Sequence, residues 1–482
     1  MGCAKLKSID LSGFDTSNVI GMDRLFMGCS QLQSLDLSSF SSRSLTTMSQ
    51  TFYNCHNLKS IKFNEKFTID DVSYMDEIFG NARSLTSVDL SHFNPKRLHN
   101  IQGMFSGCES LTEIHFPPQL KTDSAENMGA LFKDCKSLTY IDLSKFNTDA
   151  ATNMEQMFAG CVQLTSIDLS NFKTSNVESM AAMFSGCTNL GSIKIDKNNF
   201  NIEKVLSLEA MFSECTSLTS LDLSLIKGSV VTSTIKMFYK CENLASLNIQ
   251  NFQGTKVVNA AQMFQGCKNL KSINMPNFTG QMQSIQDMFE GCSSLESLNI
   301  PKMVIGAVNS LSYLFANCGK ITSLDLSNFD TSLVTQYQNM FFGCSSLTSI
   351  NFGDEEKWDT KEGVLMASMF EGCSSLKELN LNKFITRNVQ LIDKMFKGCS
   401  SLTKLDLDNF ETNVVSSMNE MFSGVTSLRQ LSLPKFNTVN KPSCENIWEG
   451  ITEMNLTIHE ALNRPILENK PEGLYVINIT NY

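Results

Sequence analysis

CVQLTSIDLSNFKTSNVESMAAMFSGC, the stretch from Cys161 to Cys187, is one copy of a pattern that recurs along the whole chain. Residues 167–169 alternate apolar and polar side chains, which predicts a half-buried strand. Val177, Met180 and Phe184 then recur at intervals of three and four, which predicts a short helix. One copy therefore combines a strand and a short helix.

Capping residues fit the same interpretation. Thr174 and Ser175 come just before the predicted helix, where a side-chain oxygen can accept hydrogen bonds from free backbone N–H groups. Gly186 follows the helix and fits a C-terminal cap. The predicted order of elements in each copy is therefore strand, turn, short helix and turn. Such a unit cannot bury both of its apolar edges alone, so it must stack on the next copy.

An aromatic residue marks the repeat throughout the chain. Neighbouring aromatics are 25 to 29 residues apart, most often 26. A period that steady indicates a solenoid, in which each repeat contacts only its neighbours. The seventeen positions are Phe26, Phe52, Phe79, Phe105, Phe132, Phe158, Phe184, Phe212, Phe238, Phe264, Phe289, Phe315, Phe341, Phe370, Phe396, Phe422 and Trp448.

The strand and its lead-in follow the pattern C-x-x-L-x-x-L-x-L. With the preceding F-x-G-C block at 341–349 and 422–433, and the N-F-x-T-S-N-V-x-x-M segment at 171–180, the chain resembles the BspA-like leucine-rich repeat surface proteins, in their mycoplasma-lipoprotein-type variant. The resemblance extends from Cys3 to Ile451. It implies an α/β leucine-rich-repeat solenoid of about 17 repeats, with a parallel sheet on one face and short helices on the other. It also implies surface display and adhesion-type binding.

We expect two regions in the chain. The solenoid covers 1–451, and its N-terminal end looks truncated because the chain opens within a repeat, at Gly2-Cys3. The repeat register then fades, and Pro465, Pro471 and Gly473 interrupt the last stretch. We expect 452–482 to be a C-terminal cap or the start of a further region.

Charge and hydropathy exclude some classes of partner. The net charge is −10, from 39 basic and 49 acidic residues, with no basic stripe along the sequence. This argues against nucleic acid and against anionic membrane surfaces as partners. No stretch is long and apolar enough to insert into a membrane, and no signal peptide precedes the repeats.

Fifteen of the sixteen cysteines occupy one repeat position. Where cysteine is missing, that position holds Ala82, Val425 or Ile451, which can neither pair nor bind metal. The position therefore requires a compact apolar group, and we expect a ladder of buried free thiols. Disulfides between adjacent repeats are the alternative. Cys444 lies off the ladder and is the candidate for a reactive thiol.

The residues between the buried strand positions form an exposed sheet face with a Ser-Asp-Ser pattern. Cationic positions fall between aspartates along it: Lys62 between Asp36 and Asp89, for example. This order relieves like-charge repulsion between strands, and it is also a candidate contact surface. The candidate partner-binding residues on this face are Asp89, His115, Tyr140, Asp142, Asp168 and Asp222.

The longest repeat carries a second candidate surface. Its extra residues follow the strand and place Asp354, Glu355 and Glu356 close to Trp358, one of only two tryptophans. Insertions in repeat proteins map to loops, often on the binding face. The other interpretation is a drifted repeat in which Trp358 replaces a core phenylalanine.

Catalysis is not expected. An open sheet offers no water-excluding pocket, and the chain has no phosphate loop, nucleophile elbow or metalloprotease motif. We expect no cofactor and no metal site. The resemblance implies a non-catalytic binding or adhesion array at the cell surface, with protein or glycan partners. The alternatives are an intracellular (cytoplasmic) interaction scaffold and a structural spacer stalk.

Overall fold

The computed structural model describes residues 3–196, 198–224, 226–353, 357–458, 462–468 and 470–478. Backbone contacts divide the chain into two compact units. Unit 1 comprises Met1–Ser233 and Met237–Leu244, and unit 2 comprises Thr234–Lys236 and Ala245–Tyr482. Each unit is a parallel β-solenoid whose coils repeat about every 26 residues, as the sequence predicts.

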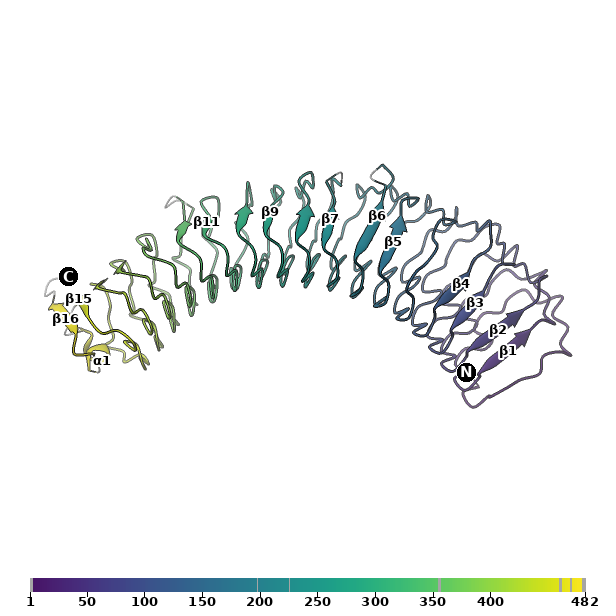
Figure 1. Ribbon diagram of the computed structural model, residues 1–482, viewed down its shortest axis with the longest axis horizontal. Helices are drawn as coiled ribbons and strands as arrows, with labels where there is room; N and C mark the ends of the chain where they lie inside the picture. Colours follow the sequence, from purple (N-terminus) through teal and green to yellow (C-terminus); the bar gives the residue numbers. More distant parts are fainter. Residues whose placement is uncertain are drawn as a thin grey trace. The chain divides into compact units, whose positions relative to one another are not determined.

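One short strand per coil forms the sheet of unit 1. The pairs β1–β2, β3–β4 and β5–β6 are parallel and in register, so that equivalent residues of adjacent coils lie side by side (Figure 1). Burial alternates along each strand, with the serine and aspartate positions outward. The strands are β1 (Ser34–Leu37), β2 (Ser60–Phe63), β3 (Ser87–Asp89), β4 (Glu113–His115), β5 (Ser166–Leu169), β6 (Ser192–Ile195) and β7 (Ser220–Asp222).

Unit 2 repeats the arrangement and ends in a larger sheet. β9 pairs with β10 and β11 with β12, and the last sheet has the order β13-β14-β15-β16. The final two strands pair in parallel with the repeats, as their alternating sequence indicates. The elements are β8 (Ser246–Asn248), β9 (Ser272–Asn274), β10 (Ser297–Asn299), β11 (Ser323–Asp325), β12 (Ser349–Asn351), β13 (Lys404–Asp406), β14 (Gln430–Leu433), β15 (Met454–Ile458), α1 (Arg464–Leu467) and β16 (Leu474–Asn478).

The predicted short helices are wrong. The only helix in the described part of the chain is α1, near the C-terminus, and the segment expected to be helical in each coil is a run of turns. In the coil that contains Phe158, the N–H of Phe158 donates to the carbonyl of Met183 in the next coil at 2.9 Å. The N–H of Gly160 likewise donates to Ser185 at 2.7 Å. These amides form a second ladder between coils instead of bonding within a helix.

Left-handed backbone positions produce this ladder. Each coil has a residue with φ near +55° two positions before the aromatic and another with φ between 53° and 82° two positions after it, as at Gln156 (φ 56°) and Gly160 (φ 73°). A left-handed residue breaks the α-helical course and sends successive N–H groups in different directions. Alternate amides therefore bond to the next coil, while those between them close local turns, as Cys161 N–H does on Phe158 O at 3.1 Å.

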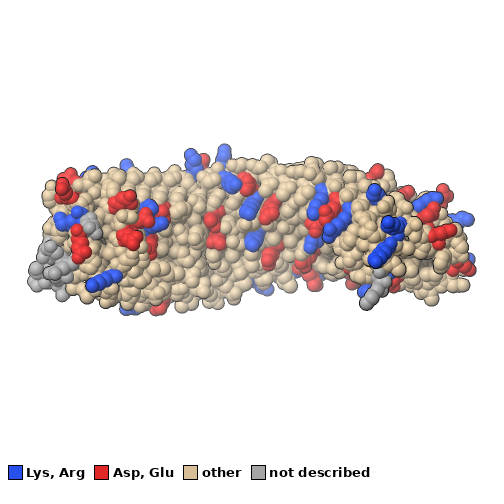
Figure 2. Space-filling view, turned by 90° about the horizontal axis from the view of Figure 1, so that it is seen from below, with Lys and Arg blue, Asp and Glu red and all other residues tan. Residues whose placement is uncertain are grey.

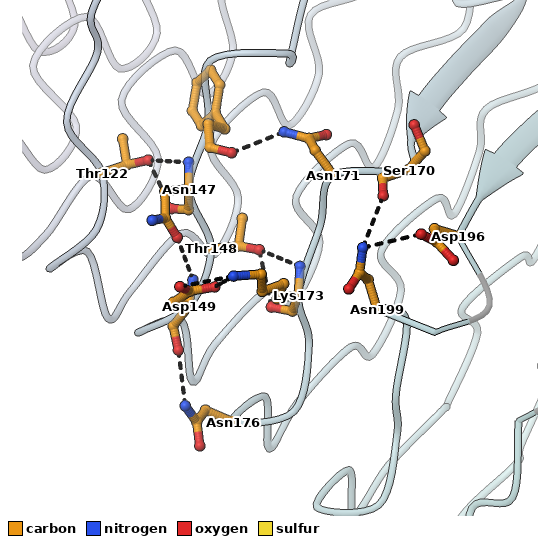
Figure 3. A network of polar contacts seen from close by, with 11 residues as sticks. Thr122, Asn147, Thr148, Asp149, Ser170, Asn171, Lys173, Asn176, Asp196 and Asn199 are labelled. Atoms are coloured by element: carbon orange, nitrogen blue, oxygen red, sulfur yellow. Dashed lines mark hydrogen bonds and ion pairs between the residues drawn. The ribbon is translucent and has the colours of Figure 1, made fainter.

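Threonine hydroxyls join the coils at the corner that follows the strand. The hydroxyl of Thr148 accepts from the N–H of Lys173 at 2.8 Å and donates to the same residue's carbonyl at 2.9 Å (Figure 3). Asn171 adds two bonds, from its amide to the carbonyls of Leu143 and Phe146. Thr174, expected to cap a helix, instead bonds in the same way to Asn201. The threonine at this corner therefore hydrogen-bonds to the backbone of the neighbouring coil.

The marker aromatics stack through the core of each unit. In unit 1, from Phe26 to Phe238, successive ring centroids are 5.5 to 5.8 Å apart and the planes differ by 3 to 13°. In unit 2, from Phe264 to Trp448, the range is 5.4 to 5.9 Å. Nearly parallel rings at these centroid separations fall within the range of roughly 4.5–7 Å for favourable aromatic pairs.

The cysteine ladder is buried, as predicted. Cys55 and thirteen equivalent cysteines are buried free thiols, whereas Cys3 is exposed and Cys444 is half-buried. The thiol also has a polar role that the sequence did not reveal. The Sγ of Cys161 donates to the carbonyl of Phe132 in the preceding coil at 3.1 Å, and the same contact recurs through both units at 3.0 to 3.3 Å. In the coils that carry the cysteine, its weak donor therefore adds a second hydrogen bond to a buried carbonyl, as at Phe132, which also accepts from the N–H of Cys135.

Candidate functional site

Aspartates at the centre of the sheet face close the turn after each strand. In β5, the Oδ1 atom of Asp168 accepts hydrogen bonds from the N–H and the hydroxyl of Ser170, at 2.9 and 2.6 Å. Its Oδ2 atom lies 2.7 Å from the ammonium of Lys194 on β6. These contacts, with Lys194 contributing most, lower the pKa of Asp168 to about 2. Asp168 therefore stabilises the surface on which it lies.

The other predicted aspartates make the same turn. The Oδ1 atoms of Asp89, Asp142 and Asp222 accept from the backbone N–H of the serine two residues later at 2.9, 2.9 and 3.0 Å. The serine hydroxyl and this N–H lower the pKa of both Asp89 and Asp142. Asparagine makes the equivalent turn elsewhere, as at Asn351. Closing the turn therefore needs a side-chain oxygen that accepts a hydrogen bond, which aspartate and asparagine both supply. The negative charge of the aspartate is not needed for the turn.

The predicted charge order is present on this face in unit 1. Lys62 lies 3.3 Å from Asp36 across β1 and β2, and Lys194 pairs with Asp168 across β5 and β6. Both pairs have more than half of each side chain exposed. Exposed pairs contribute only about 0–1 kcal/mol each, so they hold the side chains in register more than they stabilise the fold.

His115 and Tyr140 project from the same face. His115 lies beside Asp89 in the β3–β4 register, and its Nε2 atom is 3.2 Å from a carboxylate oxygen of Glu113. Tyr140 precedes the next coil's strand position with 67% of its surface exposed. We call Asp89, His115, Tyr140, Asp142, Asp168 and Asp222 the unit 1 sheet face. All six are exposed, so the fold presents the predicted residues together on one surface.

Trp358, one of the candidate partner-binding residues, is buried, so its assignment to a binding surface is wrong. Its side chain is 1% exposed, with its ring centroid 4.6 Å from that of Phe352 and 6.2 Å from that of Phe384. It therefore replaces a core phenylalanine, the alternative that the sequence left open. The neighbouring Asp354, Glu355 and Glu356 lie outside the described residues.

Neither sign of charge dominates the face of the molecule that Figure 2 shows. On the face shown in Figure 2, basic and acidic side chains alternate in small groups. Within the described ranges, no three His, Cys, Asp or Glu side chains are placed to hold a metal ion. Over the same residues, no helix has the length and hydropathy needed to cross a bilayer.

Two acidic side chains in unit 2 have the opposite electrostatics to Asp168. Asp287 is 9% exposed and accepts a hydrogen bond from the amide of Gln262 at 3.2 Å. Burial raises the pKa of Asp287, against the effect of bonds from Gln262 and Gln286. Burial and the nearby Asp287 also raise the pKa of Glu290. Both carboxylates are therefore poorly solvated at neutral pH.

We expect Asp287→Asn to stabilise the protein at pH 7. A carboxyl whose pKa is raised on folding binds protons more readily in the native state, so stability falls as pH rises from its ordinary value towards the raised one. Asparagine removes that loss and keeps an oxygen for Gln262. The thermal midpoint should rise by about 1 °C at pH 7 and stay unchanged at pH 3. Asp168→Asn is the control with the opposite sign, since its pKa is lowered.

Two family models match the sequence. The family described as "Mycoplasma protein of unknown function, DUF285" matches residues 1–65, 59–115, 89–193, 118–221, 162–278 and 345–461. The "BspA type Leucine rich repeat region (6 copies)" matches residues 260–357. Together they span the repeats described above. No curated protein matches the chain.

Several solved bacterial structures are similar. A leucine-rich repeat protein from Bacteroides ovatus is 18% identical, with a TM-score of 0.45 over 84% of this chain and 88% of that one. One from Eubacterium ventriosum is also 18% identical, with a TM-score of 0.38 over 80% and 87%. A leucine-rich cell surface protein from Faecalibacterium prausnitzii is 17% identical, with a TM-score of 0.29 over 75% and 77%. Similarity at this level of identity concerns the fold alone.

Proposed function

The chain belongs to the Mycoplasma family DUF285 and carries BspA-type leucine-rich repeats, and on that premise we propose that it is a non-catalytic, surface-displayed array that binds protein or glycan partners. Leucine-rich-repeat solenoids are in general binding scaffolds whose stacked repeats create extended surfaces. Display at the cell surface and an adhesive role are parts of this proposal.

The observation that carries the proposal is that some positions of each coil make contacts between coils, whereas others are exposed and vary. The aromatic recurs in every coil, and the thiol and the corner threonine recur in many of them, and all three make contacts between coils. The central position of the sheet face varies instead, from Asp89 to His115 to Asp142. The turn after the strand needs only an accepting side-chain oxygen, which Asn351 also supplies, so the charge at this position can change from coil to coil while the fold is kept. A surface whose charge varies in this way suits recognition.

The character of the surface indicates weak, repeated contacts. Binding energy at compact epitopes is concentrated on tryptophan, tyrosine and arginine, and Tyr140 is the only one of these on the unit 1 sheet face. A serine- and aspartate-rich surface favours many small polar contacts instead. Many such contacts, summed over clustered copies, give strong overall attachment by avidity.

The proposal predicts that neutralising this face weakens attachment. The chain would be displayed on beads and tested against extracellular-matrix proteins, glycans and intact host cells. The variant Tyr140→Ser with Asp142→Asn removes the exposed ring and one charge, while asparagine can keep the turn as Asn351 does. Two lost contacts at about 0.5–1.5 kcal/mol each should reduce binding by roughly fivefold to a hundredfold.

Tyr475→Ser is the matched control, because Tyr475 is similarly exposed (59%) on β16 in unit 2. It should leave binding unchanged. Equal losses in both variants would indicate non-specific adsorption. Binding to no partner at any bead density would support a spacer stalk or an intracellular scaffold.

A further inference from the structure

An open groove of about 590 Å³ runs across adjacent coils of unit 2, beside the buried Trp358. Its walls come from the corner that follows the strand in four successive coils. The residues that line it include Lys361, Lys383, Arg387 and Lys435, with Asp359 and Glu411. Four cationic side chains against two carboxylates make the groove basic, in a chain whose net charge is −10.

The cations are not all neutralised by their neighbours. Lys361 pairs with Asp359 at 2.9 Å. Lys383 donates to the backbone carbonyl of Gly353, and Lys435 donates to the side-chain oxygen of Asn409 at 3.4 Å, so both bond to neutral oxygens. Arg387 is exposed and lies close enough to oppose the rise that Asp359 causes in the pKa of Lys361. Positive charge therefore remains available in the groove.

A buried donor in the groove wall also lacks an acceptor. The indole nitrogen of Trp358 is inaccessible to water and has no hydrogen-bond partner. An unpaired buried N–H costs about 1–3 kcal/mol, and such groups are rare in folded proteins. Because Trp358 is one of the residues that line this groove, an oxygen of a bound ligand is a candidate acceptor for its indole N–H. This feature is independent of the charge and favours a ligand rich in acceptor oxygens.

The geometry matches a linear ligand with repeating charges. Lys383 and Lys435 precede the buried corner aromatic of coils two apart, which places their backbones roughly 10 Å apart at ~4.8 Å per coil. Asn382 and Asn409 supply amides that both donate and accept, as hydroxyl recognition requires. An acidic peptide would need apolar anchors, and Ile385 is the only large apolar side chain exposed among the groove residues.

We propose that this groove binds an anionic oligosaccharide, with sulfate or carboxylate groups held by Lys383, Arg387 and Lys435 and sugar hydroxyls held by Asn382 and Asn409. The inference rests on the proposed function, because it assumes that the chain captures ligands. It assigns that capture to residues other than the unit 1 sheet face.

The test uses the whole chain and a heparin hexasaccharide as the probe, with a neutral dextran hexasaccharide and a hexaglutamate peptide beside it. Trp448→Phe leaves Trp358 as the only indole, so fluorescence then reports on the groove alone. Phenylalanine is the residue that the other sixteen coils use at that position. We expect saturable binding of the heparin probe that changes Trp358 emission, and no binding of dextran.

Lys383→Gln with Lys435→Gln removes two charges from the groove and should weaken probe binding at least about tenfold. Lys62→Gln with Lys194→Gln removes the same charge from the sheet face of unit 1 and should not. The inference fails if both pairs lose binding equally, if Trp358 emission is unchanged, or if hexaglutamate binds more tightly than the heparin probe. Absent probe binding with bead attachment intact would overturn this inference and leave the proposed function standing.

Discussion

Replacing Phe158 with alanine is expected to lower the free energy of unfolding by about 3–5 kcal/mol, the usual cost of removing a buried aromatic side chain. Phe158 is fully buried, and its ring stacks on Phe132 at 5.6 Å and on Phe184 at 5.5 Å. Each coil contacts only its neighbours, so nothing else can refill the space. The loss should therefore be local and large.

Phe14→Ala is the control, because Phe14 is 60% exposed and its loss should change stability by no more than about 0.5 kcal/mol. Hydrogen exchange is the better readout, since long repeat arrays need not unfold in one step. In the Phe158 variant, amides of the coils that hold Phe132, Phe158 and Phe184 should lose protection first. Uniform loss along the chain would contradict nearest-neighbour stacking.

Thiol labelling should show the second large effect. Fourteen of the sixteen cysteines are buried, and burial raises the pKa of Cys55, Cys187 and Cys344 to about 12. The thiolate is the reactive form, and with a pKa of about 12 only about one such thiol in ten thousand is ionised at pH 8. Iodoacetamide should modify Cys3 readily and Cys444 slowly in the native protein, and all sixteen thiols after denaturation.

Intact-mass measurement counts the labels directly. Burial and the nearby Glu468 raise the pKa of Cys444, so it should react more slowly than the exposed Cys3. Prompt native labelling at more than two positions would contradict the buried ladder. Fewer than sixteen labels after denaturation without reductant would mean that disulfides had formed, which is the alternative that the sequence left open.

The period, the parallel sheet and the buried ladders could all be predicted, because each rests on one residue type repeated at one spacing. The helix could not be predicted correctly. The spacing of Val177, Met180 and Phe184 suits one face of a helix, yet it suits a tight coil equally well. The sequence did carry a signal for the left-handed backbone. Most coils have glycine at the position of Gly186, and others have residues such as Asn81 and Asp134, which also tolerate φ > 0.

The candidate surfaces were only partly predictable. Alternation along the strands placed the unit 1 sheet face correctly, but not the turn that each aspartate closes. The serine two residues later was the signal, as at Asp168 and Ser170. For Trp358 the sequence left a surface and a core position open, although Trp358-Asp359-Thr360 parallels Phe329-Asp330-Thr331, which favours the core. The basic groove joins side chains from separate coils, and no local motif marks such a set.

The central claim is that many weak contacts act together, and the dependence of binding on display density tests it most directly. The affinity of the soluble chain for host cells or matrix would be compared with that of the same chain at increasing density on beads. We predict weak binding in solution, with Kd roughly micromolar or weaker, and a gain of about 10²–10⁴-fold on clustering. Tight binding in solution that clustering does not improve, or no binding at any density, would contradict the account.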